Sequence, residues 1–168
     1  PELPISGEQL TSPASAYQMV SMLEGVITRG TGRRIADSGL VLAGKTGTTN
    51  DNTNAMFIGF SPDLVVGVYV GYDIPRPLGK SETGSTAAVP IFKDFMMDAL
   101  ANAPIIPFRR PGGISLVPIH AETGERVRHD DKMAVLEAFK PGQRPKSGIL
   151  IDLPDASPAS GVDAPALY

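Results

Sequence analysis

The sequence of 168 residues predicts an α+β fold in which antiparallel strands are flanked by two helices. Two segments, near residues 12–30 and 87–102, carry apolar residues at helical spacing. Three apolar, β-prone runs lie between them and are separated by turn-forming residues. From residue 104 onward, prolines interrupt every weak strand or helix pattern. We therefore expect one domain over residues 1–103 and a proline-rich, irregular extension over residues 104–168.

Both predicted helices carry an apolar stripe, and the first also has a start signal. The first is predicted to begin at Ser12, because serine followed by proline is typical of an N-cap and a first helical position. Gly30 and Gly32 are expected to end it. Its apolar stripe, expected to lie in the core, consists of Ala16, Met19, Val20, Leu23, Val26 and Ile27. The stripe of the second helix, over residues 87–102, consists of Val89, Phe92, Phe95, Met96, Ala99 and Leu100.

The strands are predicted to form an antiparallel meander that is half of a larger sheet. They cover the apolar run from residue 41 and residues 55–60 and 64–72, with turns at residues 50–54 and 61–63. One face of the last strand carries Val66, Val68 and Val70, and the other carries Val65, Gly67, Tyr69 and Gly71. Because glycine has no Cβ, we expect a helix to pack closely on the second face.

The extension carries weaker patterns. Residues 115–119 and 125–128 are predicted to pair as a small hairpin, and residues 132–139 to form a short helix. Residues 153–168 are rich in Pro, Ala, Ser and Asp and are predicted to be a tail. The composition favours a surface wrap or a linker for the extension as a whole.

Composition excludes several classes of function. A net charge of −3 gives no electrostatic case for binding nucleic acid, and the absence of cysteine excludes disulfides and thiolate chemistry. No apolar run approaches the ~18 residues of a membrane span. His120 and His129 are isolated, so we expect them to be surface or packing residues and predict no metal site and no cofactor. The chain starts without methionine or a signal peptide, and we expect it to be a piece of a longer protein.

Residues 41–49 carry the chemistry of the chain, since an apolar run leads directly into a lysine, a glycine and three threonines. In an extended strand Lys45 and Gly47 share one face, and Thr46 and Thr48 share the other, unless a bulge at the glycine rotates them together. The simplest interpretation is an edge strand whose lysine discourages pairing with other sheets. Residues 39–46 also match the G-x-x-x-x-G-K-[ST] pattern of a phosphate-binding loop. That loop needs a strand before its first glycine and a helix after its lysine, and neither is predicted here.

The sequence Lys45-Thr46-Gly47, hereafter the Lys-Thr-Gly motif, also matches a motif of the penicillin-recognising serine enzymes. Together with the helix before it and the strand pair after it, the motif resembles the C-terminal part of the transpeptidase domain of class A penicillin-binding proteins. The resemblance extends from about residue 12 to residue 95, and more loosely to the end of the chain. It implies the C-terminal half of a β-lactamase/transpeptidase-like fold, on the periplasmic side of a bacterial inner membrane.

The resemblance also implies roles for individual residues. Lys45 and Thr48 would be catalytic, the lysine through its positive field beside the nucleophile and the threonine through its backbone N–H in the oxyanion hole. Lys45, Thr46, Gly47 and Thr48 together would bind the substrate, a D-alanyl-D-alanine stem peptide of peptidoglycan or a β-lactam. The hydroxyls of Thr46 and Thr48 would hold the terminal carboxylate, and Gly47 would allow close approach.

The sequence also departs from the family pattern. It contains no S-x-x-K motif for the nucleophilic serine and no S-x-N motif. Met56 and Tyr69 occupy positions where the family often has tryptophan, and Asn54 replaces a common aspartate. We therefore expect the chain alone to be inactive and to need an upstream half of the same protein that carries the serine.

Two alternatives to the transpeptidase interpretation remain open. In the first, the chain is a fragment of a related D,D-carboxypeptidase or serine β-lactamase. In the second, it is a non-catalytic docking module. A half-sheet leaves an unpaired edge and an uncovered apolar face, which self-association of the fragment would cover.

Overall fold

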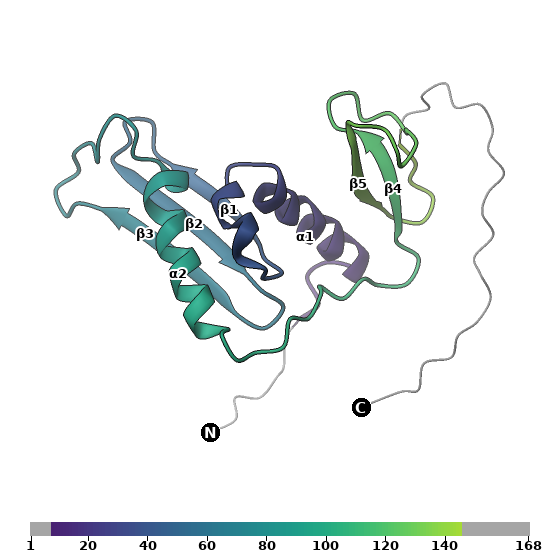
Figure 1. The fold of residues 1–168 in the computed structure, drawn as a ribbon, viewed down its shortest axis with the longest axis horizontal. Coiled ribbons are helices and arrows are strands. Elements are labelled where there is room, and N and C mark those ends of the chain that lie inside the picture. The colour runs from purple at the N-terminus through teal and green to yellow at the C-terminus, as the bar shows by residue number, and fades with distance from the viewer. Residues whose placement is uncertain (1–7, 146–168) are drawn as a thin grey trace.

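The computed structural model describes residues 8–145, which contain two antiparallel sheets and two α-helices (Figure 1). The elements, in chain order, are α1 (Pro13–Thr28), the 3₁₀ helix η1 (Arg33–Ser38), β1 (Ala43–Thr48), β2 (Asn54–Phe60), β3 (Val65–Gly71), the π-helix η2 (Gly84–Ala88), α2 (Val89–Ala99), β4 (Ser115–His120) and β5 (Ala134–Phe139).

Helix α1 begins and ends where the sequence predicts. The Ser12 hydroxyl accepts a hydrogen bond from the Ser15 N–H at 3.1 Å, as an N-cap does, and the helix stops at Thr28, before the glycines. The prediction of a buried stripe is wrong for its first half, because Met19 is 55% exposed. Helix α1 lies beside the edge strand β1 (Figure 1), and its buried residues, Gly25 and Ile27, lie in the last turn. After α1, residues 33–38 form η1, which buries Ile35 completely.

The predicted three-stranded meander is confirmed, with the order β1-β2-β3 and antiparallel pairing throughout. Thr46 is in register with Phe57, and Phe57 with Val68, so these three side chains share a face. Helix α2 covers this face, and Phe92 packs edge-on against Phe57 with ring centroids 4.8 Å apart. The core consists of Ile27, Ile35, Leu42, Phe57, Ala88, Val89, Phe92 and Met96.

The helix packs on the valine face of β3, so the predicted packing on its glycine face is wrong. The glycines that permit close packing are instead Gly44 and Gly59. A Cβ at Gly59 would lie 2.6 Å from both Phe57 and Phe92. The opposite face of the sheet is apolar and open among the described residues: Ile58 is 61% exposed, Val65 70% and Tyr69 63%.

Helix α2 starts at Val89, two residues later than predicted, directly after the π-helix η2, and it ends at Ala99 rather than at residue 102. Val89, Phe92 and Met96 are buried as predicted. Phe95 is 50% exposed and Ala99 is exposed as well, so both were wrongly assigned to the core. At 100° per residue Phe95 lies at the flank of the buried face, where the sheet no longer covers it.

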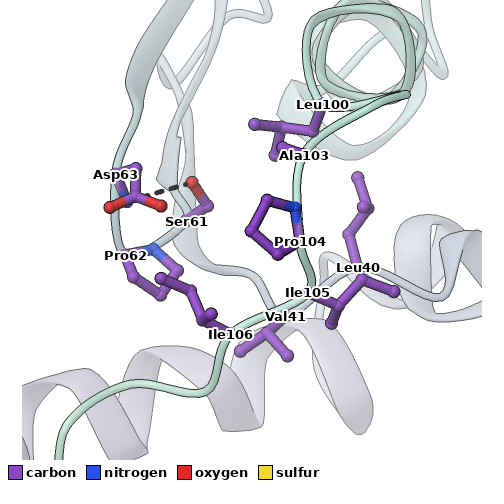
Figure 2. A pocket seen from close by; sticks show the side chains of 10 residues that line it. All are labelled: Leu40, Val41, Ser61, Pro62, Asp63, Leu100, Ala103, Pro104, Ile105 and Ile106. Atoms are coloured by element: carbon purple, nitrogen blue, oxygen red, sulfur yellow. Dashed lines mark hydrogen bonds between the residues drawn. The ribbon is translucent and has the colours of Figure 1, made fainter. Parts of the chain in front are cut away.

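After α2 the chain crosses back toward the start of β1. A small, mainly apolar pocket forms there, between segments that are distant in the sequence (Figure 2). Its lining consists of Leu40, Val41, Ser61, Pro62, Asp63, Leu100, Ala103, Pro104, Ile105 and Ile106. The Ser61 hydroxyl accepts hydrogen bonds from the N–H groups of Asp63 and Leu64, which closes the β2–β3 turn. We assign this pocket no chemical role.

The extension forms a second sheet in which β4 pairs with β5. The predicted helix over residues 132–139 is therefore wrong, because its residues from Ala134 onward form a strand. A short apolar run gives no periodicity that separates strand from helix, and pairing with β4 decides the outcome. The predicted pairing of residues 125–128 with β4 is present over a short stretch, as an antiparallel bridge between Ile119 and Arg126. It is made by hydrogen bonds from the N–H of His120 to the carbonyl of Glu125 and from the N–H of Val127 to the carbonyl of Pro118. The predicted tail over residues 153–168 lies outside the described residues, and the boundary at 103/104 stays a prediction.

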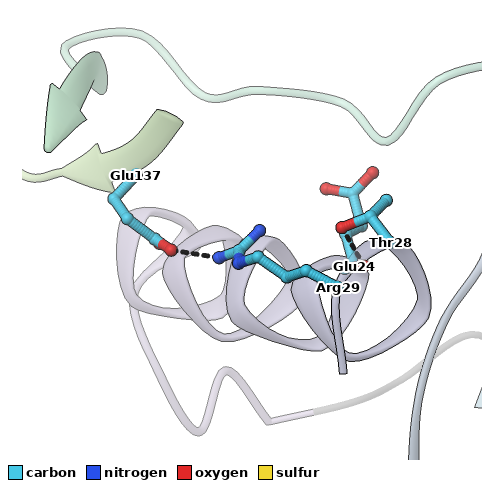
Figure 3. A network of polar contacts seen from close by, with 4 residues as sticks. All are labelled: Glu24, Thr28, Arg29 and Glu137. Carbon is cyan, nitrogen blue, oxygen red and sulfur yellow. Dashed lines mark hydrogen bonds and ion pairs between the residues drawn. The ribbon is translucent and has the colours of Figure 1, made fainter. Parts of the chain in front are cut away.

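Strand β5 and the residues after it contact α1 through polar groups. Gln18 donates to the carbonyl of Ala138 at 2.8 Å, and Lys140 donates to the Ser15 hydroxyl at 2.6 Å. Arg29 forms an ion pair with Glu137 (Figure 3). The described part of the extension is thus a small sheet attached to α1.

Candidate active site

Strand β1 holds the Lys-Thr-Gly motif at the edge of the three-stranded sheet. Thr46 and Thr48 are in register with the buried residues Phe57 and Ala55, which places both threonines on the helix-covered face. Lys45 is in register with the exposed Ile58, on the opposite face. The predicted division of these side chains between two faces is confirmed, and the register runs through Gly47 without a bulge.

The outer edge of β1 presents backbone groups of the motif. The N–H of Thr49 donates to the carbonyl of Asn54, the first residue of β2, so the odd-numbered residues of β1 direct their backbone groups toward β2. Because these groups alternate along a strand, the N–H of Thr48 and the carbonyl of Thr46 point to the outer edge. The Lys45 ammonium donates to that Thr46 carbonyl at 2.9 Å. A cationic group and a backbone donor therefore lie along one exposed edge.

Both threonine hydroxyls have partners in segments outside β1. The Thr46 hydroxyl lies 2.8 Å from the Thr31 hydroxyl, in the turn after α1. The Thr48 hydroxyl accepts a hydrogen bond from the N–H of Gly84, at the start of η2, at 3.0 Å. An N–H can only donate, so the Thr48 hydroxyl keeps its own proton for another acceptor.

Gly84 allows η2 to approach the motif. A Cβ on this buried residue would lie 2.5 Å from the carbonyl oxygen of Met56 and 2.7 Å from that of Gly47. Any side chain would therefore push η2 off the sheet. The next residue, Ser85, donates its hydroxyl to the Thr31 carbonyl at 2.8 Å, which closes a ring of contacts around the motif.

Sequence reasoning missed Thr31, Gly84 and Ser85. Residues 73–85 contain prolines and glycines, a composition that predicts a loop rather than part of a site. The signal was present in the two short sequences Gly-Thr-Gly at residues 30–32 and Thr-Gly-Ser-Thr at residues 83–86, where a small residue that permits close approach adjoins hydroxyl groups.

The described residues offer no group of three or more His, Cys, Asp or Glu side chains that would hold a metal ion. The Nδ1 atom of His120 accepts from the N–H of Glu122 at 3.3 Å, inside a turn of the small sheet. Over residues 8–145 no helix has both the length and the apolar character that a membrane span requires. The chemistry of the motif is thus that of hydroxyls, an ammonium group and backbone amides.

A family model described as the penicillin-binding protein transpeptidase domain matches residues 3–97. The chain belongs to the penicillin-binding protein transpeptidase family. It is 46% identical over 132 residues to penicillin-binding protein 1A of Rickettsia prowazekii, an alignment that covers 79% of this chain and 16% of the relative. With penicillin-binding protein 1A of Pseudomonas aeruginosa it shares 41% identity over 145 residues, covering 86% of this chain and 18% of the relative.

The structure agrees with the sequence relationship. The chain superimposes on penicillin-binding protein 1A of Haemophilus influenzae with a TM-score of 0.72 at 32% identity, covering 83% of this chain and 22% of that protein. This transpeptidase-family chain thus spans about a sixth of the length of the curated relatives that it matches.

Proposed function

We propose that this chain supplies the substrate-binding strand of a peptidoglycan D,D-transpeptidase, within the part of the transpeptidase domain that follows the nucleophilic serine. The observation that carries the proposal is the arrangement along β1, where the Lys45 ammonium, the Thr48 N–H and two threonine hydroxyls held by other segments lie within four consecutive residues. These are the groups that an acyl transfer to serine needs beside its nucleophile.

Each group takes one role in this proposal. The hydroxyls of Thr46 and Thr48 hold the terminal carboxylate of a D-alanyl-D-alanine stem peptide or of a β-lactam. The Thr48 N–H is one donor of the oxyanion hole, where the loss of a single donor costs on the order of 3 kcal/mol of transition-state stabilisation. Lys45 supplies positive charge beside the serine, and Gly47 leaves room for the substrate backbone.

The nucleophile must come from another segment, because residues 1–168 contain no S-x-x-K and no S-x-N. The serine oxygen forms an ester with the penultimate D-alanine while the terminal D-alanine leaves with a proton, and the amine of a second stem peptide then takes the acyl group. A D,D-carboxypeptidase or a β-lactamase differs in using water as the acceptor. The chain alone is expected to be inactive, and its place is the periplasmic face of a bacterial inner membrane.

The open sheet face favours an upstream half as the partner of this chain. Ile58, Val65 and Tyr69 are more than half exposed, although the other face of the same sheet packs against α2. Exposed apolar patches of this kind mark surfaces that another segment covers. We propose that the segment carrying the serine lies on or beside this face.

A chimeric protein tests the function. Residues 1–145 replace the matching segment of the Pseudomonas aeruginosa relative, and labelling of its serine by a fluorescent penicillin is measured. We expect labelling by the chimera and a loss of roughly a hundredfold or more in the rate for Lys45→Ala, in line with the removal of a charge at the transition state. Lys132→Ala, at an exposed lysine in the turn before β5, is the matched control and should label normally. Equal labelling by both variants would contradict the proposed role of the motif.

A further inference from the structure

Thr31 lies between two glycines, Gly30 and Gly32, in the turn that follows α1. Its hydroxyl contacts the Thr46 hydroxyl at 2.8 Å, and its carbonyl accepts from the Ser85 hydroxyl at 2.8 Å. A Cβ at Gly32 would lie 2.9 Å from the Ile27 side chain, so the turn is packed tightly against the end of α1. Thr31 is thus held from both sides with its hydroxyl directed at the motif.

We propose that Thr31 is a positioning residue that orients the Thr46 hydroxyl toward the carboxylate of the substrate. This inference rests on the proposed function, since it concerns the same carboxylate-binding strand.

The chemistry of hydroxyl groups supports this role. A hydroxyl has one proton to donate and two lone pairs that accept. When a carboxylate binds, Thr46 donates its proton to the carboxylate and accepts the proton of Thr31. Among the described residues Thr46 is the hydrogen-bonding partner of the Thr31 hydroxyl, so the Thr31 proton has no competing acceptor there. A chain of two hydroxyls ending on a charged acceptor is stronger than either bond alone.

The same logic applies to the second hydroxyl of the strand. The Gly84 N–H donates to Thr48 as Thr31 would donate to Thr46, so each threonine is supported from behind and keeps one proton for the substrate. Ser85, next to Gly84, holds the backbone of Thr31. The two supports therefore belong to one connected ring that runs from the end of α1, through β1, to the start of η2.

The contribution of Thr31 to stability alone is expected to be small. Thr31 is exposed, so water can replace its hydroxyl bond in the absence of substrate. The Thr31 hydroxyl contributes to binding when a substrate carboxylate displaces that water. Thr46 then donates to the carboxylate, and Thr31 donates to Thr46.

The test uses the chimera and three variants. Thr31→Val removes the hydroxyl and keeps the shape, Thr31→Ser keeps the hydroxyl, and Thr28→Val is the matched control. The Thr28 hydroxyl donates to the Glu24 carbonyl within α1, away from β1. Acylation by benzylpenicillin, which has the free carboxylate, is compared with acylation by its methyl ester, which does not, and melting temperatures are recorded.

We expect Thr31→Val to lower the acylation efficiency with benzylpenicillin by about threefold to tenfold, the range for one hydrogen bond between neutral groups, mainly through weaker binding. The efficiency with the methyl ester should not change, and Thr31→Ser should restore most of the loss. If Thr31→Val matches Thr28→Val, or loses equally with both compounds, Thr31 is not a positioning residue. If Thr46→Val also acylates benzylpenicillin normally, the proposed function of the strand fails as well. A loss for Thr46→Val alone overturns only the role of Thr31.

Discussion

The hydroxyl and the backbone N–H of Thr48 point in different directions. Its hydroxyl lies on the helix-covered face and accepts from Gly84, while its N–H points to the outer edge of β1. The side chain and the backbone of this residue can therefore be tested separately.

Two substitutions at Thr48 separate these groups. Thr48→Val removes the hydroxyl and is expected to weaken β-lactam binding by about threefold to tenfold. Thr48→Pro also removes the N–H, and proline is tolerated where an edge strand directs its N–H away from the sheet. We expect it to lower the acylation rate of the chimera by ~10²–10³-fold, the effect of losing an oxyanion donor. Stopped-flow acylation measures both, and similar losses for the two variants would exclude an oxyanion role for the N–H.

Glu24 is a half-buried carboxyl on α1. Burial raises its pKa above the usual value, so the folded chain binds the proton of Glu24 more tightly than the unfolded chain does. The free energy of unfolding therefore falls as the pH rises through this raised pKa.

Glu24→Gln is expected to increase the free energy of unfolding at pH 7, because it removes the cost of burying a charge. The gain should fade as the pH falls below the raised pKa, where the native glutamate is also neutral. Urea denaturation of the chain at several pH values measures the difference. Glu122→Gln, at an exposed glutamate, is the control and should have little effect. A gain that persists unchanged into acid would show that charge is not its cause.

At the scale of elements, the contact between η2 and β1 depends on one missing side chain. Gly84→Ala places a Cβ against two backbone carbonyls, which cannot move as a flexible side chain would. We expect a loss of about 1–3 kcal/mol in the free energy of unfolding, typical of overpacking, together with weaker acylation. Gly112→Ala is the control, since a Cβ there has nothing within 4 Å. Equal unfolding midpoints for the two variants would mean that η2 is not seated on the strand as described.

The sheet as a whole leaves one face open among the described residues. If an upstream half covers it, an aspartate at Val65 would place an unpaired charge in an apolar interface. Val65 is 70% exposed on the same face and is in register with Phe60, at the far end of the hairpin from the Lys-Thr-Gly motif. Val65→Asp is then expected to reduce serine labelling of the chimera by roughly tenfold or more and to lower its melting temperature. Ile74→Asp is the control, because Ile74 is 83% exposed and lies in the loop after β3. Labelling that survives Val65→Asp would favour another arrangement of the two halves.

Much of the fold could be predicted from local signals. The N-cap at Ser12, the turns after β1 and β2, and the alternation of side chains in β1 follow from residue type and spacing alone. The errors concern contacts between distant segments. Phe95 and Met19 fit an apolar stripe but lie beyond the reach of the sheet, and β5 becomes a strand only because β4 lies beside it.

The candidate site shows the same division. The Lys-Thr-Gly motif was found from the sequence because its residues are contiguous. Thr31 and Ser85 were not found, because each is distant in the sequence from the residue that it contacts. Thr31 lies 15 residues before Thr46, and Ser85 lies 54 residues after Thr31. Only the packing of α1, β1 and η2 brings them together.

The central claim is that the outer edge of β1 binds the carboxylate and the carbonyl of the acyl donor. A crystal structure of the chimera acylated by benzylpenicillin tests it most directly. The account predicts the penicillin carboxylate at about 3 Å from the hydroxyls of Thr46 and Thr48, and the former lactam carbonyl oxygen at a similar distance from the Thr48 N–H. A penicilloyl group whose carboxylate and carbonyl both lie away from β1 would contradict the account.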